Sequence, residues 1–169
     1  AKSGGGNYAG AIKTDGTLWM YGNNASGVLG QNNRTNYSSP RQVGSDSTWS
    51  KLASMSTCAL AIKTDNTMWA WGQNTNGRLG LNQATSVAYS SPVQVPGTTW
   101  ANVLSTDNSA IAVKTDNTMW AWGVNSEGGE LAQNDRTARS SPTQIPGDWR
   151  SGDRQIGSID FGFTAIRNL

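Results

Sequence analysis

The chain has 169 residues, with 14% charged, 36% hydrophobic, 8 tryptophans, no histidine and a net charge of +2. This composition excludes a charge-rich disordered tail, a clustered basic face for nucleic acid and histidine-based catalysis or metal binding. No apolar run approaches the roughly 18 residues that cross a bilayer. We therefore expect a folded non-enzyme without cofactor or metal, and without nucleic-acid partners or membrane insertion.

The first predicted hairpin lies close to the N-terminus. An apolar run ending at Ile12 and an aromatic run over 17–21 flank the dipeptide Asp15-Gly16. Both residues tolerate the positive φ that tight hairpin turns require, so the pattern predicts two short strands. Side chains alternate across a strand, so Trp19 and Tyr21 should share one face. We interpret this aromatic stripe as packed between neighbouring sheets, with a sugar-binding platform as the alternative.

A glycine-punctuated loop over 22–30 follows, and a polar stretch then leads to Ser38-Ser39-Pro40. Proline lacks a backbone donor and is confined to strand starts or edges, so the Ser-Ser-Pro run predicts the start of a third strand. Trp49 opens a fourth strand. The unit therefore holds about four short strands and no helix.

This unit recurs along the whole chain. Thr14 of the first hairpin corresponds to Thr64 and Thr115, which gives periods of 50 and 51 residues. A single repeat domain over 1–169 is expected, with copies at about 8–57, 58–108 and 109–161 and a partial fourth at 162–169. Four strands per period predict an all-β chain of β-propeller blades, each of four antiparallel strands. Three blades and a fraction are too few for a closed ring, so we expect an incomplete ring or arc.

The ordered landmarks A-I-K-T-D-x-T-x-W-x-W-G, then S-S-P-x-Q-V, then W, resemble the regulator of chromosome condensation repeat. The resemblance covers about 8–169 and implies blades of a type that forms seven-bladed propellers. The family includes a nucleotide exchange factor for a small nuclear GTPase and a secreted bacterial inhibitor of β-lactamase, so fold transfers better than function. A histidine is common in the family at one position of each copy, and here that position holds Tyr8, Cys58 and Ser109.

Several reactive side chains have structural explanations. The hairpin aspartates Asp15, Asp65 and Asp116 are predicted to be turn residues rather than catalytic acids. The single cysteine, Cys58, is predicted to be a small buried residue, with a reactive thiol as the alternative.

The third copy differs from the other two. Its loop has one extra residue, and Ala132 stands where Gly30 and Gly80 stood. The same loop holds Glu127 and Glu130, with Asp135 nearby. These three carboxylates could bind a cation, but a solvated loop is the preferred interpretation.

The segments that differ between copies are the predicted partner surface, because binding residues usually lie on loops of a rigid scaffold. These segments span 32–37, 82–89 and 133–139, and they nominate Asn36, Tyr37, Tyr89 and Arg139 as binding residues.

The function expected is a non-enzymatic protein-interaction or structural assembly module. It would bind a protein partner or self-associate to complete the propeller. The polar, low-charge repeats resemble those of microbial surface and bacteriophage proteins, which favours an extracellular or virion surface role in decoration or adhesion over a cytoplasmic one. The alternatives are a propeller lectin for cell-surface glycans, an exchange-factor-like regulator, and an enzyme with a site on the pore face.

Overall fold

The computed structural model describes residues 2–83, 86–126, 128–147, 149, 156–159 and 162–165, with side chains described only between 6 and 149. These residues form three four-stranded antiparallel sheets and one hairpin. The first sheet contains β1 (Lys2–Gly5), β2 (Tyr8–Ile12), β3 (Leu18–Gly22) and β4 (Tyr37–Gln42). The second contains β5 (Trp49–Ser54), β6 (Cys58–Lys63), β7 (Met68–Gln73) and β8 (Ala88–Gln94). The third contains β9 (Trp100–Ser105), β10 (Ser109–Lys114), β11 (Met119–Gly123) and β12 (Arg139–Ile145), and the hairpin contains β13 (Ile156–Ile159) and β14 (Gly162–Ala165).

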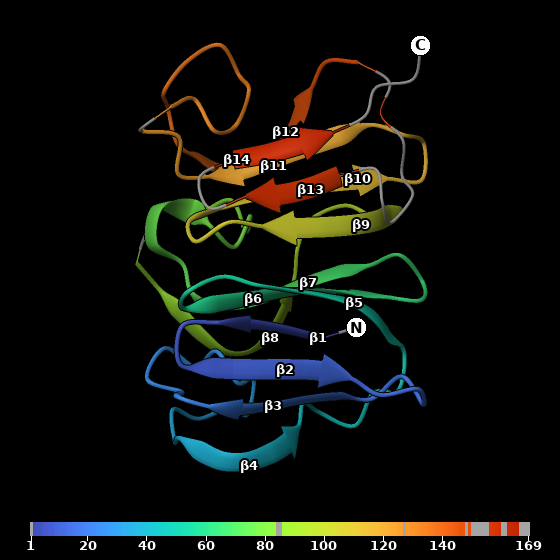
Figure 1. Cartoon of the computed structure of the whole chain (residues 1–169), viewed down its shortest axis with the longest axis vertical. Coiled ribbons are helices and arrows are strands. Elements are labelled where there is room, and N and C mark those ends of the chain that lie inside the picture. The colour runs from blue at the N-terminus through green and yellow to red at the C-terminus, as the bar shows by residue number, and fades with distance from the viewer. Residues whose placement is uncertain are drawn as a thin grey trace.

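The sheets follow one another in chain order as propeller blades (Figure 1). Within each four-stranded sheet the strands lie in sequence order. The first strands of successive sheets are neighbours, since β5 contacts both β1 and β9, and β13 contacts β9. The predicted all-β class, with three blades and the beginning of a fourth, is confirmed. The helical element found among the described residues is a single 3-10 turn, η1 (Thr75–Gly77).

The predicted alternation of the aromatic strand is also confirmed. In the second blade, Met68 and Ala70 pack in the cluster shared with the third blade. Trp71 instead packs in the cluster shared with the first blade. Both faces of the central strands of the second blade are therefore buried between blades, which is why these strands carry apolar residues at almost every position.

The Ser-Ser-Pro run differs from its prediction. It lies inside the outermost strand of each sheet, which begins at Tyr37, Ala88 or Arg139. Pairing between β3 and β4 shifts register between Met20 and Gly22, opposite this run. An edge strand with a bulge has no need of a donor at Pro40, so the proline fits the strand interior there.

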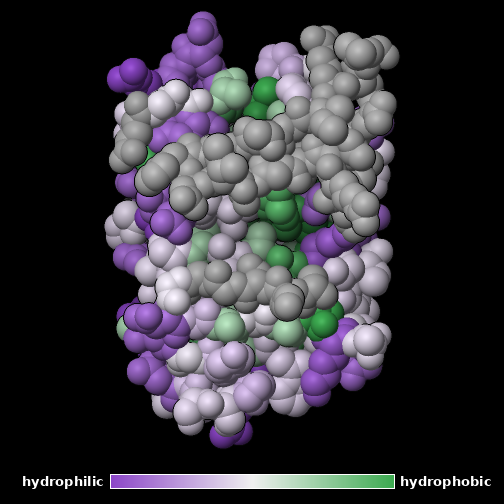
Figure 2. All heavy atoms as spheres, in the orientation of Figure 1, coloured by the Kyte–Doolittle hydropathy of each residue, from purple (hydrophilic) through white to green (hydrophobic). Residues whose placement is uncertain are grey.

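Three apolar clusters hold the blades together. One lies between the first and second blades, one lies between the second and third, and the last lies on the far face of the third. In the view of Figure 2, hydrophobic residues show mainly in the middle of the visible face, at the level of β5 and β9. Among the described residues, no helix has the length and apolar character of a transmembrane segment.

Candidate interaction surfaces

The hairpin tips have the same hydrogen bonds in all three blades. Asp15 Oδ1 accepts bonds from the Thr17 amide (3.0 Å) and hydroxyl (2.6 Å), and Trp19 Nε1 donates to that same hydroxyl oxygen (2.8 Å). The second and third blades repeat every one of these bonds. The threonine side-chain and backbone bonds lower the pKa of all three aspartates, which favours their ionised form. The prediction that Asp15, Asp65 and Asp116 are turn residues is confirmed.

The lysine of each hairpin lies over tryptophan rings. Lys13 Nζ lies 3.7 Å from the ring centre of Trp19. Lys63 Nζ lies 4.3 Å from Trp69 and 4.9 Å from Trp49, and Lys114 has the equivalent position in the third blade. Lys63 also forms an ion pair with Asp46 (2.7 Å). These cations are engaged by their own blades through cation–π contacts.

A tryptophan joins each blade to the one before it. Trp71 Nε1 donates to the Val28 carbonyl of the first blade (2.6 Å), and Trp122 Nε1 donates to the Arg78 carbonyl of the second (3.1 Å). Both tryptophans are 0% exposed. Tyr21 holds the equivalent position of the first blade and is 43% exposed. Among the described residues, no strand covers the outer face of the first sheet at Tyr21, although that face is equivalent to the one that the second and third blades bury.

This contact also explains the third-copy irregularity. A side chain at Gly80 would meet the Trp122 ring, with its Cβ 2.8 Å from Nε1, and φ is 70° there. Ala132 keeps the positive φ of 53°. It is exposed, and a Cβ is tolerated because no described tryptophan packs against it.

A buried asparagine organises the loop between the third and fourth strands of every blade. Asn24 accepts the Leu29 amide (2.8 Å) and donates to the Asn33 carbonyl (2.9 Å). Asn74 and Asn125 make the same pair of contacts in their loops. These three asparagines were not predicted from the sequence, although each has a fixed place after the aromatic strand of its copy.

The four residues nominated as binding residues brace their own loops. Asn36 Oδ1 accepts the Asn24 amide (2.7 Å), and the Tyr37 hydroxyl accepts a bond from Asn33 (3.1 Å). Tyr89 donates to Gln83 Oε1 (2.6 Å), and Arg139 pairs with Asp135 (2.5 Å). They belong to three different blades and are not brought together as one site. Their role in binding stays a prediction.

A cleft lies between the loops of the first and second blades. It has a volume of about 240 Å³ and is lined by Arg34, Ser26, Gln73 and Ser86, with two alanines. Arg34 is exposed and makes no hydrogen bond or ion pair with any described residue. Arg34 was not predicted as a binding residue from the sequence, although the loop over 23–36 contains no acidic residue.

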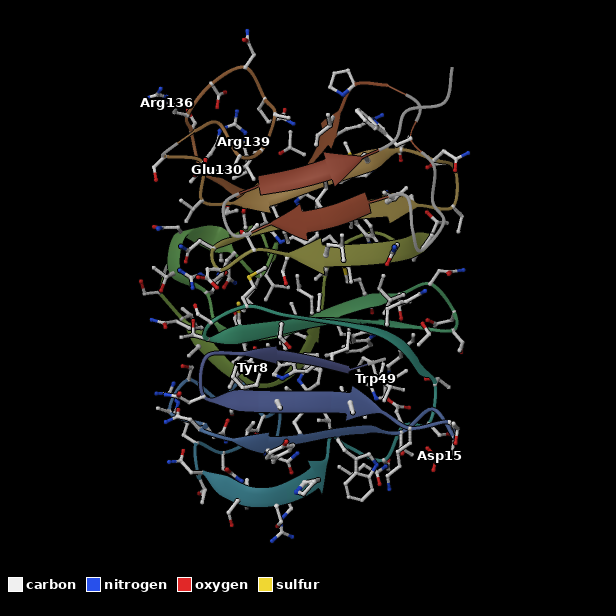
Figure 3. All side chains as sticks on the ribbon, viewed as in Figure 1. Tyr8, Asp15, Trp49, Glu130, Arg136 and Arg139 are labelled. Atoms are coloured by element: carbon white, nitrogen blue, oxygen red, sulfur yellow. The ribbon has the colours of Figure 1, made fainter. Side chains whose placement is uncertain are left out.

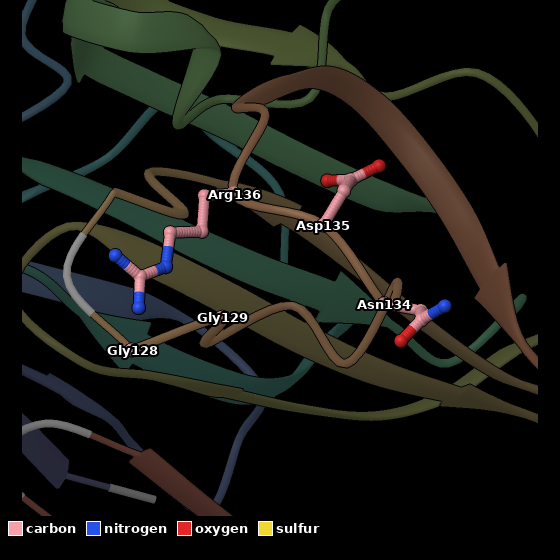
Figure 4. A pocket seen from close by; sticks show the side chains of 5 residues that line it. All are labelled: Gly128, Gly129, Asn134, Asp135 and Arg136. Carbon is pink, nitrogen blue, oxygen red and sulfur yellow. The ribbon is translucent and has the colours of Figure 1, made fainter.

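A second pocket, of about 310 Å³, lies within the third-copy loop (Figure 4) and is lined by Gly128, Gly129, Asn134, Asp135 and Arg136. Asp135 accepts the Thr137 amide (2.8 Å) and pairs with Arg139, and these contacts lower its pKa. Glu127 lies outside the described residues. Within the described part of the chain, no three His, Cys, Asp or Glu side chains are grouped to hold a metal.

The positions where the family commonly has histidine are structural here. The Tyr8 hydroxyl lies 2.6 Å from the Met55 carbonyl and 2.7 Å from the Cys58 carbonyl, so it ties the first blade to the second. Cys58 is fully buried beside the Met55 sulfur (3.2 Å), and burial raises the pKa of its thiol to about 12. The prediction of a buried cysteine is confirmed.

The two sides of the molecule differ in character. Figure 3 shows Asp15 and Trp49 on the side of the hairpin tips, and Glu130, Arg136 and Arg139 on the opposite side. We call the second side the loop face, defined by the loops 23–36, 74–83, 86–87, 124–126 and 128–138. It carries the Arg34 cleft and the Arg136 pocket.

Sheets of four antiparallel strands, joined by repeated indole–carbonyl bonds, define a β-propeller repeat protein. The chain belongs to the regulator of chromosome condensation (RCC1) repeat family, which matches residues 15–62 and 65–105. Among curated proteins, no relative of this sequence was found.

Solved structures share the fold at low sequence identity. Human WBSCR16 is 18% identical, with a TM-score of 0.74, over 86% of this chain and 37% of its own. Prp20p from Saccharomyces cerevisiae, in a study of its binding to Gsp1p and histones, is 16% identical, with a TM-score of 0.77, over 87% of this chain and 38% of its own. Yeast RCC1 (Prp20) bound to Kap60 is 15% identical, with a TM-score of 0.74, over 87% and 37%. The chain thus spans a little over a third of the length of these proteins.

Proposed function

We propose that this chain is a non-enzymatic protein-interaction module that associates through the open face of its first blade. The observation that carries the proposal is Tyr21, which is 43% exposed where Trp71 and Trp122 are 0% exposed. On the same face, Tyr21 pairs with Ala9 of the neighbouring strand, and Trp19 pairs with Ala11. The matching alanines of the second blade, Ala59 and Ala61, are fully buried against the first.

The occupant we propose for this face is a second copy of the chain. The two internal interfaces show what such a face accepts, namely leucine, methionine and valine side chains with a carbonyl placed for the ring donor. Apolar faces that stay open in a folded protein commonly mark association sites. The protein partners named for Prp20p, which are Gsp1p, histones and Kap60, support an interaction role at the level of the family.

Sedimentation equilibrium over a range of concentrations tests the proposal. The wild-type chain should associate, and Tyr21→Ser should shift the association to at least tenfold higher concentration. Val87→Ser is the matched control, because Val87 is also 43% exposed but lies in the loop before β8. A wild-type chain that stays monomeric at all concentrations, or equal effects of the two variants, would refute association through this face.

The remaining parts of the functional expectation stay predictions. The extracellular or virion placement rests on composition. Glycan binding would require aromatic side chains free to stack on sugars, and the hydroxyls of Tyr37 and Tyr89 are already engaged within their loops. Among the described residues, Tyr21 is the aromatic residue classed as exposed, and a glycan array run on wild type and Tyr21→Ser would test it.

A further inference from the structure

The structure assigns a second binding site to the loop face: the cleft around Arg34 takes a carboxylate from an acidic segment of a partner protein. This inference rests on the proposed function, because it specifies what an interaction module would bind. It concerns a different surface from the open face of the first blade, so the two can fail independently.

The cleft offers hydrogen-bond donors, and no described residue of the chain pairs with the positive charge of Arg34. The Arg34 guanidinium has five N–H donors in a planar fork that matches a carboxylate. It makes no hydrogen bond or ion pair with any described residue. Ser26, Ser86 and Gln73 line the same cleft and can donate to, or accept from, a peptide backbone. None of the described lining residues is acidic.

The charge of the surrounding loops favours an anion at this place. The loops over 23–36 and 74–87 contain Arg34 and Arg78 and no acidic residue. Arg78 is buried, and it donates to the Thr75 carbonyl (3.0 Å) and the Thr57 hydroxyl (3.2 Å) rather than to a carboxylate. Two positive charges therefore lie in neighbouring loops without acidic residues, and such a surface attracts an acidic partner.

The third blade supplies a natural comparison. Arg136 has the same place in its loop as Arg34, but the third-copy loop contains Glu127, Glu130 and Asp135. Asn33 of the first copy is replaced there by Asp135, which is ionised and paired with Arg139. Of the two equivalent arginines, Arg34 is therefore the one whose loop contains no acidic residue.

The size of the cleft favours a side chain of a protein over a small molecule. Its volume of about 240 Å³ is below the roughly 300–1,000 Å³ of typical small-molecule sites. A backbone bond joins the two blades beside the cleft, since the Asn32 amide donates to the Ser90 carbonyl (2.7 Å). A preformed cleft with one free guanidinium suits a single aspartate or glutamate presented by an extended peptide.

Fluorescence anisotropy with a labelled hexa-aspartate peptide tests the assignment, with hexa-asparagine as the neutral probe. Arg34→Gln should weaken hexa-aspartate binding at least fivefold, and Arg34→Lys should restore only part of it. Arg136→Gln is the matched control with the same change in charge, and its effect should stay within twofold. Amide chemical shifts of Ser26 and Ser86 should move on titration.

Four outcomes would overturn the assignment. They are no binding of hexa-aspartate, equal losses in the two arginine variants, amide shifts confined to the hairpin tips, and competition by inorganic phosphate at concentrations where acetate has no effect. The last would assign the cleft to phosphate. The Tyr21→Ser variant separates the two proposals, because it should keep hexa-aspartate binding whether or not the chain self-associates.

Discussion

Replacement of Trp71 by phenylalanine tests whether the indole–carbonyl bond couples neighbouring blades. The ring is 0% exposed, its Nε1 donates to the Val28 carbonyl at 2.6 Å, and its centre lies 6.1 Å from that of Trp49. Val28 is itself buried, so its carbonyl would be left buried without this partner. Phenylalanine keeps most of the apolar contact while it removes the donor.

The expected loss of stability follows from two contributions. A buried acceptor left without a partner costs about 1–3 kcal/mol. Removal of a whole buried aromatic side chain costs about 3–5 kcal/mol, partly through the cavity that it leaves. Phenylalanine leaves only a small part of that cavity, so we assign about 1 kcal/mol to the smaller ring. Trp71→Phe should therefore lower the free energy of unfolding by about 2–4 kcal/mol, a large share of the 5–15 kcal/mol typical of a domain.

Urea unfolding followed by far-UV circular dichroism measures this loss. Tyr21→Phe is the control, because Tyr21 occupies the equivalent but exposed position and should change stability by no more than about 0.5 kcal/mol. Repeat proteins are stabilised by nearest-neighbour contacts, so the amides of the first blade should also exchange faster in Trp71→Phe. A loss below about 1 kcal/mol, or one equal to that of Tyr21→Phe, would refute the coupling.

Two more predictions concern the hairpin tips and the loops. The pKa values of the turn aspartates Asp15, Asp65 and Asp116 are lowered in the folded chain, so their contribution to stability is present above about pH 4 and is lost as the pH falls through the folded values. A variant with all three aspartates changed to asparagine should therefore lose less thermal stability between neutral and acid pH than the wild type. An unchanged dependence of the melting temperature on acid pH would contradict this. Asn74→Ala leaves the buried Leu79 amide without an acceptor and should cost about 1–3 kcal/mol. Asn108→Ala, at an exposed turn, should be nearly neutral in the same urea assay.

Much of the fold was predictable because its signals are local. The Asp15-Gly16 dipeptide predicted the first hairpin, and the structure places positive φ at Gly16 and at the matching asparagines Asn66 and Asn117. Period-two alternation predicted that Trp69 and Trp71 share one face of their strand, and both pack in the cluster between the first and second blades. The position of Pro40 was predicted less well, because a bulge on an edge strand depends on the partner strand rather than on the Ser-Ser-Pro run itself.

The candidate binding residues were less predictable. Tyr37, Tyr89 and Arg139 were nominated because their loops vary between copies, but each side chain is engaged by a neighbour within its own loop. Arg34 was missed because the cleft that it lines forms only where loops of the first and second blades meet. Variation between copies indicates where a loop may change, and contacts decide which of its atoms remain available.

By itself the sequence determined the blade. Turn residues and strand alternation depend on a few neighbouring positions, and the period near 50 residues repeats them, so all three can be recognised without the structure. Only the tertiary structure decided which equivalent residues differ in role. Tyr21 and Trp71 occupy the same place in their strands, yet one is open and the other buried, because burial depends on whether another blade packs against that face. Arg34 and Arg136 occupy equivalent places in their loops, yet Arg34 lines a cleft with residues of the second blade, whereas Arg136 lines a pocket within its own loop beside Asp135.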